Sequence, residues 1–252
     1  MAIMAFLLSC SKKDESCDCI PPPSISYNDV ILKFEGMTGG QPMELLKTFK
    51  DPLGRDLHVE LFKFYVSDIY VNSGANQTKV GKVDLITLED PNVIGPGNDL
   101  KYTVLKVPYG NYDGITFHIG LDPAQNESDP NSFAPDHPLS SAQNTHWGTW
   151  SNYKFLMMEG KGDWDMNGTL TDIYGYHTGF DQCYREVTLT SQVSSDASGS
   201  TDTIRVTFDF NDIFFGSDTL DMKIFPTWHG DTSTIWISET LSDNFSKALK
   251  LK

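Results

Sequence analysis

Short segments rich in β-branched and aromatic residues recur along the chain, and clusters of Gly, Pro and Asn separate them. The strongest is residues 59–71 (VELFKFYVSDIYV), where apolar and polar residues alternate in part. Many short strands at regular spacing are typical of all-β proteins. We therefore predict an all-β fold, an antiparallel β-sandwich of the Greek-key, immunoglobulin-like kind. The other predicted strands are residues 30–34, 83–88, 102–107, 114–119, 153–159, 186–192, 203–210, 221–225 and 234–238.

Helical character is limited to a few short segments. We predict helical pieces at residues 43–49, 211–215 and 243–249. Strands do not alternate with long helices, which argues against a doubly wound α/β fold. Residues 122–145 are polar and rich in Pro, Asn and Ser, and a loop of this length in a compact domain is usually functional or mobile.

The charge balance excludes one class of partner. The 252 residues include 34 acidic and 19 basic side chains, for a formal net charge of −15. A field of this sign repels phosphate backbones, so we expect no nucleic-acid partner, whereas cations are compatible with it. No apolar run reaches the roughly 20 residues that a membrane-spanning helix needs.

The N-terminus has the features of a targeting segment. Residues 1–9 form a short apolar run, and the string LLSC at residues 7–10 resembles a bacterial lipobox, in which Cys10 becomes the lipidated N-terminus after cleavage. The alternative is a frayed apolar end with an incidental cysteine. We predict a signal-peptide remnant over 1–9, a lipidated tether over 10–27 and one domain over 28–252. The protein would then be an outer-membrane lipoprotein of the bacterial cell envelope, facing the periplasm or the surface.

The cysteines are unevenly distributed along the chain. If Cys10 carries lipid, then Cys17, Cys19 and Cys183 remain, and an odd number leaves at least one thiol unpaired in an oxidising compartment. The closely spaced Cys17 and Cys19 could chelate a soft metal such as Cu(I). The alternative is that they are incidental thiols on a tether.

The sequence lacks the motifs of common enzyme classes. We find no G-x-S-x-G, H-E-x-x-H, P-loop or C-x-x-C motif. A pair of catalytic carboxylates cannot be picked out of 34 acidic residues by sequence. We therefore expect a protein without catalytic turnover and keep a β-sandwich hydrolase only as an alternative.

One acidic segment has the spacing of a calcium loop. Asp163, Asp165 and Asn167 begin the string DWDMNG, which matches the first six positions of an EF-hand loop. Position twelve is Tyr174 instead of the bidentate Glu, and no helices flank the segment. The string could bind Ca²⁺ in another context, or it could be a hairpin tip built on Asn167 and Gly168. The calcium interpretation supports an alternative function, a calcium-braced surface module for a glycan or protein ligand.

Three of the six histidines lie in distinctive settings. His146 begins the string HWGTW, His177 lies in YHTG, and His229 lies in WHG. Neutral imidazole binds copper, and two histidines with a weak third ligand suit Cu(I). The alternative is that the tryptophans belong to the core and the histidines lie at strand ends.

An ordered series of segments resembles the MbnP-like family of copper-binding proteins. The resemblance runs through most of residues 30–250 and implies a β-sandwich that binds copper outside the cytoplasm. The segments are FYVSDI (64–69), VPYGNY (107–112) with ITFHIGLD (115–122), HWGTW (146–150) with YKF (153–155) and EG (159–160), and HTG (177–179).

The resemblance also implies a copper chemistry. In this family one Trp can be oxidised to kynurenine by a partner dihaem peroxidase-like enzyme, and Cu(I) then binds two histidines and the modified residue. Carried over by position, His146 and His177 are the candidate ligands, and Trp147 or Trp150 is the modifiable residue. His229 is a further candidate from its local setting. The expected function is that of an extracytoplasmic, lipid-anchored protein that holds or delivers copper.

Overall fold

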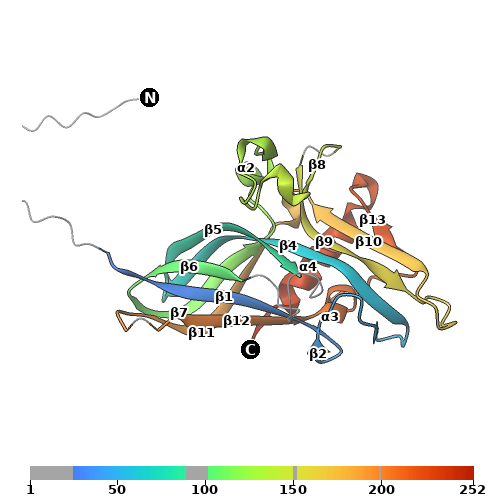
Figure 1. Ribbon diagram of the computed structural model, residues 1–252, viewed down its shortest axis with the longest axis horizontal. Helices are drawn as coiled ribbons and strands as arrows, with labels where there is room; N and C mark the ends of the chain where they lie inside the picture. Colours follow the sequence, from blue (N-terminus) through green and yellow to red (C-terminus); the bar gives the residue numbers. More distant parts are fainter. Residues whose placement is uncertain (1–24, 89–101, 150–151, 199) are drawn as a thin grey trace, which may run out of the picture.

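The computed structural model describes residues 25–88, 102–149, 152–198 and 200–252, and about half of these residues lie in strands (Figure 1). Cys10, Cys17, Cys19 and Trp150 lie outside the described residues. Within the described ranges, no helix is long and apolar enough to cross a bilayer.

The smaller of two sheets has five strands. Its order is β14-β12-β1-β2, and β6 also pairs with β1. β1 and β12 run parallel along eight residue pairs, from Val30 opposite Asp202 to Met37 opposite Asp209. The strands are β1 (Tyr27–Thr38), β2 (Gln41–Pro42), β6 (Thr103–Pro108), β12 (Asp202–Asp209) and β14 (Lys250–Leu251).

The larger sheet has nine strands in the order β11-β7-β4-β9-β10-β13, with β3 and β5 paired to β4, and β8 paired to β9. β10 and β13 run parallel. The strands are β3 (Phe49–Lys50), β4 (Asp56–Ser73), β5 (Asn76–Leu88), β7 (Gly110–Ile119), β8 (His146–Trp147), β9 (Asn152–Gly162), β10 (Asp172–Gly179), β11 (Arg185–Ser195) and β13 (Thr227–Trp228).

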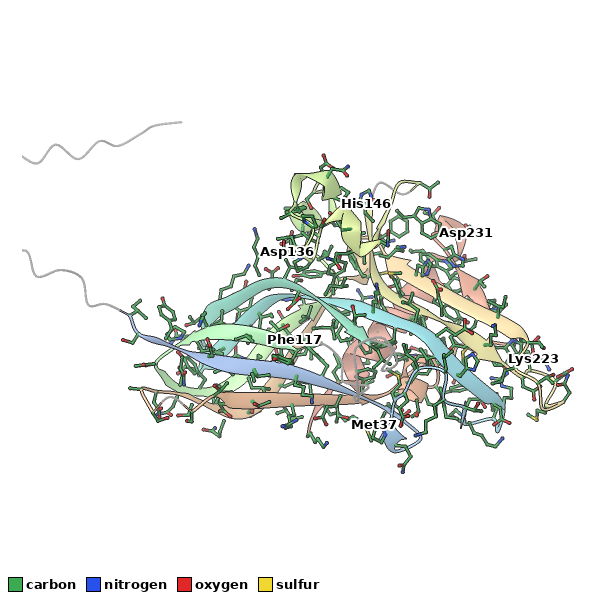
Figure 2. The ribbon with its side chains drawn as sticks, in the orientation of Figure 1. Met37, Phe117, Asp136, His146, Lys223 and Asp231 are labelled. Atoms are coloured by element: carbon green, nitrogen blue, oxygen red, sulfur yellow. The ribbon has the colours of Figure 1, made fainter. Side chains whose placement is uncertain are left out.

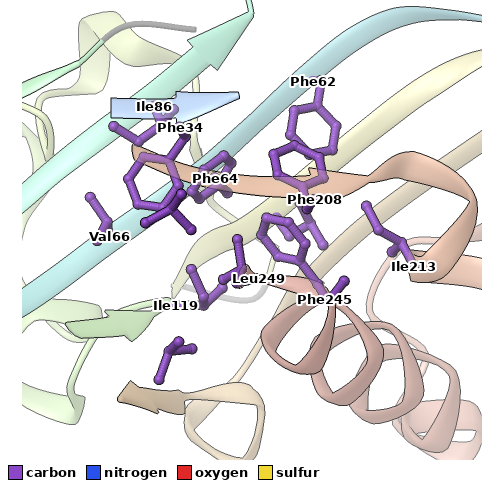
Figure 3. Packing of buried hydrophobic residues seen from close by; sticks show 14 of the residues in the cluster. Phe34, Phe62, Phe64, Val66, Ile86, Ile119, Phe208, Ile213, Phe245 and Leu249 are labelled. Carbon is purple, nitrogen blue, oxygen red and sulfur yellow. The ribbon is translucent and has the colours of Figure 1, made fainter. Parts of the chain in front are cut away.

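The two sheets pack face to face through an aromatic core (Figure 3). Phe62 of β4 stacks on Phe208 of β12, with ring centroids 5.4 Å apart. Phe245, from helix α4 (Ile235–Ala248), lies 5.0 Å from Phe64 and 5.1 Å from Phe208. Helix α4 therefore contacts both sheets, and each buried ring contributes roughly 1.5–3 kcal/mol of transfer free energy.

The prediction of a mostly β protein with few helices is confirmed, but the expectation of a purely antiparallel fold is wrong. The parallel pairs β1–β12 and β10–β13 make both sheets mixed. The immunoglobulin-like Greek-key arrangement stays a prediction, because the strand order does not show it. The polar segment 122–145 holds three short helical turns, namely α2 (Pro123–Asn126), η1 (Pro130–Ser132) and η2 (Ser141–Gln143).

The C-terminal segments differ most from the sequence predictions. Residues 234–238 were expected to be a strand, but they enter helix α4, whose residues Ile237, Leu241, Phe245 and Ala248 are buried at helical spacing. The helix predicted at 243–249 is the second half of α4, and the one at 211–215 is α3 (Phe210–Phe214). Tertiary burial along one helical face thus overrides the strand propensity of the first turn.

Two other segments form turns where regular elements were predicted. In the expected strand 221–225, the Asp221 side chain accepts a hydrogen bond from the Lys223 backbone N–H, which favours a turn. In the expected helix 43–49, the backbone N–H groups of Met43 and Leu46 donate to strands β1 and β4. Leu46 also has a φ of 62°, which is incompatible with an α-helix.

Strand β4 is irregular around Asp68: its register with β7 shifts between Ser67 and Tyr70, and its register with β5 shifts between Ile69 and Tyr70. Asp68 has a φ of 46°. Its carboxylate accepts hydrogen bonds from Lys79 and from the Tyr184 hydroxyl. Burial opposes ionisation of Asp68, but the hydrogen bonds from Lys79 and Tyr184 outweigh it and hold the pKa of this carboxyl below its usual range.

Candidate functional site

The parallel pairing of β10 and β13 brings two histidines together. Tyr176 lies opposite Trp228 in this register, and both side chains are buried in the core. Because side chains alternate along a strand, the next residues, His177 and His229, lie on the opposite face of the sheet. Their ring centroids are 4.7 Å apart, and the ring planes meet at 74°.

A tryptophan packs against both histidines. The centroid of Trp147, in β8, lies 5.6 Å from that of His177 and 5.7 Å from that of His229. Figure 2 shows the segment that contains His146 and the turn that contains Asp231 on the same, upper side of the molecule. Residues far apart in the sequence therefore form one cluster, which we call the His–Trp cluster: Trp147, His177 and His229.

His177 is the most enclosed member of the cluster. Only 8% of the residue is exposed, and its Nδ1 atom is buried without a hydrogen-bond partner among the described residues. Its Nε2 atom lies 2.7 Å from a carboxylate oxygen of Glu159 in β9. Burial lowers the pKa of His177 and also that of His229, which keeps both imidazoles in the neutral form that binds metals.

A cation lies over the indole of the cluster. The ammonium group of Lys154 is 5.5 Å from the centroid of the Trp147 ring. Burial lowers the pKa of Lys154. A positive charge over an aromatic face is attracted by the ring quadrupole and opposes removal of an electron from that ring.

His146 does not join this cluster. Its ring packs on Tyr153, with centroids 4.9 Å apart, and Tyr153 is buried in a separate small core. His146 and Trp147 are consecutive strand residues, so their side chains point to opposite faces. Of the three predicted histidines, the structure thus pairs His177 with His229 and places His146 against Tyr153.

An acidic cleft lies beside the cluster. It has a volume of about 230 Å³, and Glu60, Glu159, Gly175 and His229 are among its lining residues. Glu159 therefore contacts both the cleft and His177. The Glu159 carboxylate, at the edge of the cluster, favours the approach of a cation over that of an anion, whereas the Glu60 carboxylate is paired with His58 and Lys161.

The predicted calcium segment is the connection between β9 and β10. The carboxylate of Asp163 accepts hydrogen bonds from the backbone N–H groups of Asn167 and Gly168, at 2.9 and 2.7 Å. The Asp165 carboxylate accepts one from the Asn167 side chain. Gly168 has a φ of 88°, as a tight turn requires. These oxygens hold the turn, and no three His, Cys, Asp or Glu side chains in the described ranges converge as a metal-binding group.

Sequence reasoning missed two residues of the site. Glu159 and Lys154 were part of the family-like segments EG and YKF, but nothing in their spacing indicated contact with His177 or Trp147. Cys183 is buried and forms no disulfide within the described ranges, and its thiol lies 3.1 Å from the Ser238 hydroxyl. Trp150, the second modifiable candidate, lies outside the described residues.

Comparison with known proteins decides the family. The sequence profile of the MbnP family matches residues 27–230. The chain belongs to the MbnP family. Its fold is similar to the solved structure of MbnP from Methylosinus trichosporium, with a TM-score of 0.55, 15% sequence identity and 82% of each chain covered. No curated protein matches the chain significantly.

The MbnP match contains the whole His–Trp cluster. It begins at the first residue of β1 and ends one residue after His229. Helix α4 follows the matched region, although its Phe245 completes the core between the sheets. The part of the chain that matches MbnP thus contains the cluster. The C-terminal helix lies outside the match and packs in the core between the two sheets.

Proposed function

We propose that this protein binds copper as cargo, through His177 and His229, beside Trp147. The observation that carries the proposal is the pairing of two neutral imidazoles, one of which has a buried ring nitrogen with no hydrogen-bond partner among the residues that the structure describes. Two imidazole nitrogens suit Cu(I), whereas a structural zinc site requires four ligands. The MbnP family is associated with copper handling, which supports the same metal.

Trp147 is the residue we propose for oxidation to kynurenine. Its indole contacts both histidine rings, so a modified side chain here would lie next to the bound ion. A dihaem peroxidase-like partner would supply the oxidation. Trp150 is the second candidate named by the family resemblance.

The location of the protein is part of the proposal. Lipid on Cys10 would attach the domain to a membrane of the bacterial cell envelope, with the residues up to 27 as a tether. A Cys10→Ser variant expressed in a bacterial host should then move from the membrane fraction to the soluble fraction. Equal membrane association of the variant and the natural protein would argue against the anchor.

Copper titration of the purified domain tests the binding site. The protein should bind one Cu(I) ion per chain. His177→Ala and His229→Ala should each weaken Cu(I) binding at least tenfold, since each removes one of two ligands. His146→Ala is the matched control, because it removes an imidazole that packs on Tyr153 outside the cluster. Equal copper content in all four proteins would refute the assignment.

A further inference from the structure

The two ring nitrogens of His177 have different surroundings. Nε2 lies 2.7 Å from Oε1 of Glu159, and Nδ1 is buried with no hydrogen-bond partner in the part of the chain that the structure describes. A buried polar atom left unpaired destabilises a fold. Among the described residues nothing satisfies Nδ1 of this enclosed side chain, so it is available to a ligand.

The chemistry of Glu159 fixes which nitrogen carries the proton. An ionised carboxylate has only acceptor atoms, so the hydrogen bond requires an Nε2–H donor on the imidazole. In a neutral ring the other nitrogen, Nδ1, then has a free lone pair. Carboxylates or carbonyls that hold the second ring nitrogen of a histidine ligand in this way fix its tautomer and orientation.

We propose that Glu159 is the positioning residue of the His–Trp cluster, which holds His177 so that Nδ1 is the copper-binding atom. This inference rests on the proposed copper function and adds the ligating atom and the residue that presents it. Glu159 acts through His177 and does not itself bind the metal.

The sheet register explains how Glu159 reaches His177. Glu159 lies opposite Gly175, and His177 is two residues further along β10 on the same face. Gly175 has no side chain to fill the space between them. A Cβ atom built at this position would lie 3.5 Å from Nε2 of His229 and 4.0 Å from Cγ of Glu159. Gly175 thus lies between the side chain of Glu159 and the imidazole of His229.

Imidazole ¹⁵N NMR of the copper-free protein tests the tautomer directly. His177 should give the signals of an Nε2–H tautomer, with Nδ1 unprotonated. In Glu159→Leu this tautomer should no longer dominate, whereas Glu159→Gln should keep it because its amide oxygen can still accept the hydrogen bond. A dominant Nδ1–H tautomer in the natural protein would overturn the proposal.

Cu(I) competition titration then measures the consequence for binding. Glu159→Leu should weaken copper binding roughly 10- to 100-fold, the usual effect of losing a partner of a histidine ligand. Glu159→Gln should recover most of that loss. Glu60→Leu is the matched control, because Glu60 lines the same cleft but its carboxylate pairs with His58 and Lys161. If Glu60→Leu and Glu159→Leu weakened copper binding equally, the effect would be one of charge, and the role of Glu159 in positioning His177 would be overturned.

The outcomes separate this inference from the proposed function. Copper binding with a shift of the Nε2 signal instead of Nδ1 would overturn the ligating atom and leave the copper function intact. Failure of the natural protein to bind copper would overturn both the function and the ligand assignment. The tautomer in the copper-free protein is measured in either case.

Discussion

The imidazole rings of His177 and His229 lie 4.7 Å apart because two short parallel strands bring them into register. Tyr176 and Trp228, one position earlier on each strand, are buried in the core and fix that register. Core packing on one face of the sheet therefore fixes the positions of the two histidines on the other face.

The packing of α4 should be essential for stability. Phe245 contacts Phe62, Phe64 and Phe208, so Phe245→Ala removes a ring shared by both sheets. We expect a loss of about 3–5 kcal/mol in the free energy of unfolding. Urea unfolding measures it, and Trp236→Ala, at a 42% exposed position on the same helix, is the control with a much smaller loss. Equal losses would contradict this role of Phe245.

Removal of the charge over Trp147 should make this tryptophan easier to oxidise. The ammonium of Lys154 lies 5.5 Å from the ring centroid and destabilises a positive charge on the indole. With the same oxidising partner, Lys154→Met should be converted to the kynurenine form several-fold faster, as followed by intact mass. Lys154→Arg retains the charge and should react at the natural rate. A slower reaction of Lys154→Met would contradict this prediction.

Trp147→Phe separates the proposed oxidation of Trp147 from the proposed copper site. Phenylalanine keeps an aromatic ring beside both histidines but cannot form kynurenine. The variant should show no oxidative mass change at this position and should bind Cu(I) more weakly than the modified natural protein. Its affinity should stay above that of His177→Ala, which loses a ligand. If Trp147→Phe still gained the full mass of the modification, the modified residue would be another tryptophan.

Acid should weaken the Asp68 bulge. The pKa of Asp68 is lower in the folded protein than in the unfolded chain, so its contribution to stability is complete above about pH 4 and is lost as the pH falls through the folded pKa. Asp68→Asn lacks this contribution, and Asn tolerates the φ of 46°. The stability difference between the two proteins should therefore shrink as the pH falls below about 4. A difference that is constant with pH, measured by urea unfolding, would refute the role of the charge.

Local sequence pattern predicted much of the fold. Strand β4 was found because its apolar and polar residues alternate in part, β9 was found as a short segment rich in aromatic and apolar residues, and α3 was found at nearly the right residues. The start of α4 was missed because its β-branched and aromatic residues favour a strand when tertiary contacts are ignored. The parallel pairs could not be predicted, since they join segments distant in the sequence.

The site was predicted only in part for the same reason. His177 and His229 were named as candidates from their local strings, and Trp147 from the family resemblance. Their association depends on the β10–β13 register, which no local pattern encodes. Glu159 reaches His177 across two neighbouring strands, and that contact also requires knowledge of the pairing.

The most direct measurement is a crystal structure of the Cu(I)-loaded domain with anomalous data collected on both sides of the copper absorption edge. We predict a single copper peak bonded to Nδ1 of His177 and to a ring nitrogen of His229, with the side chain at position 147 beside it. A copper peak elsewhere, or none at this pair of histidines in fully loaded protein, would contradict the assignment.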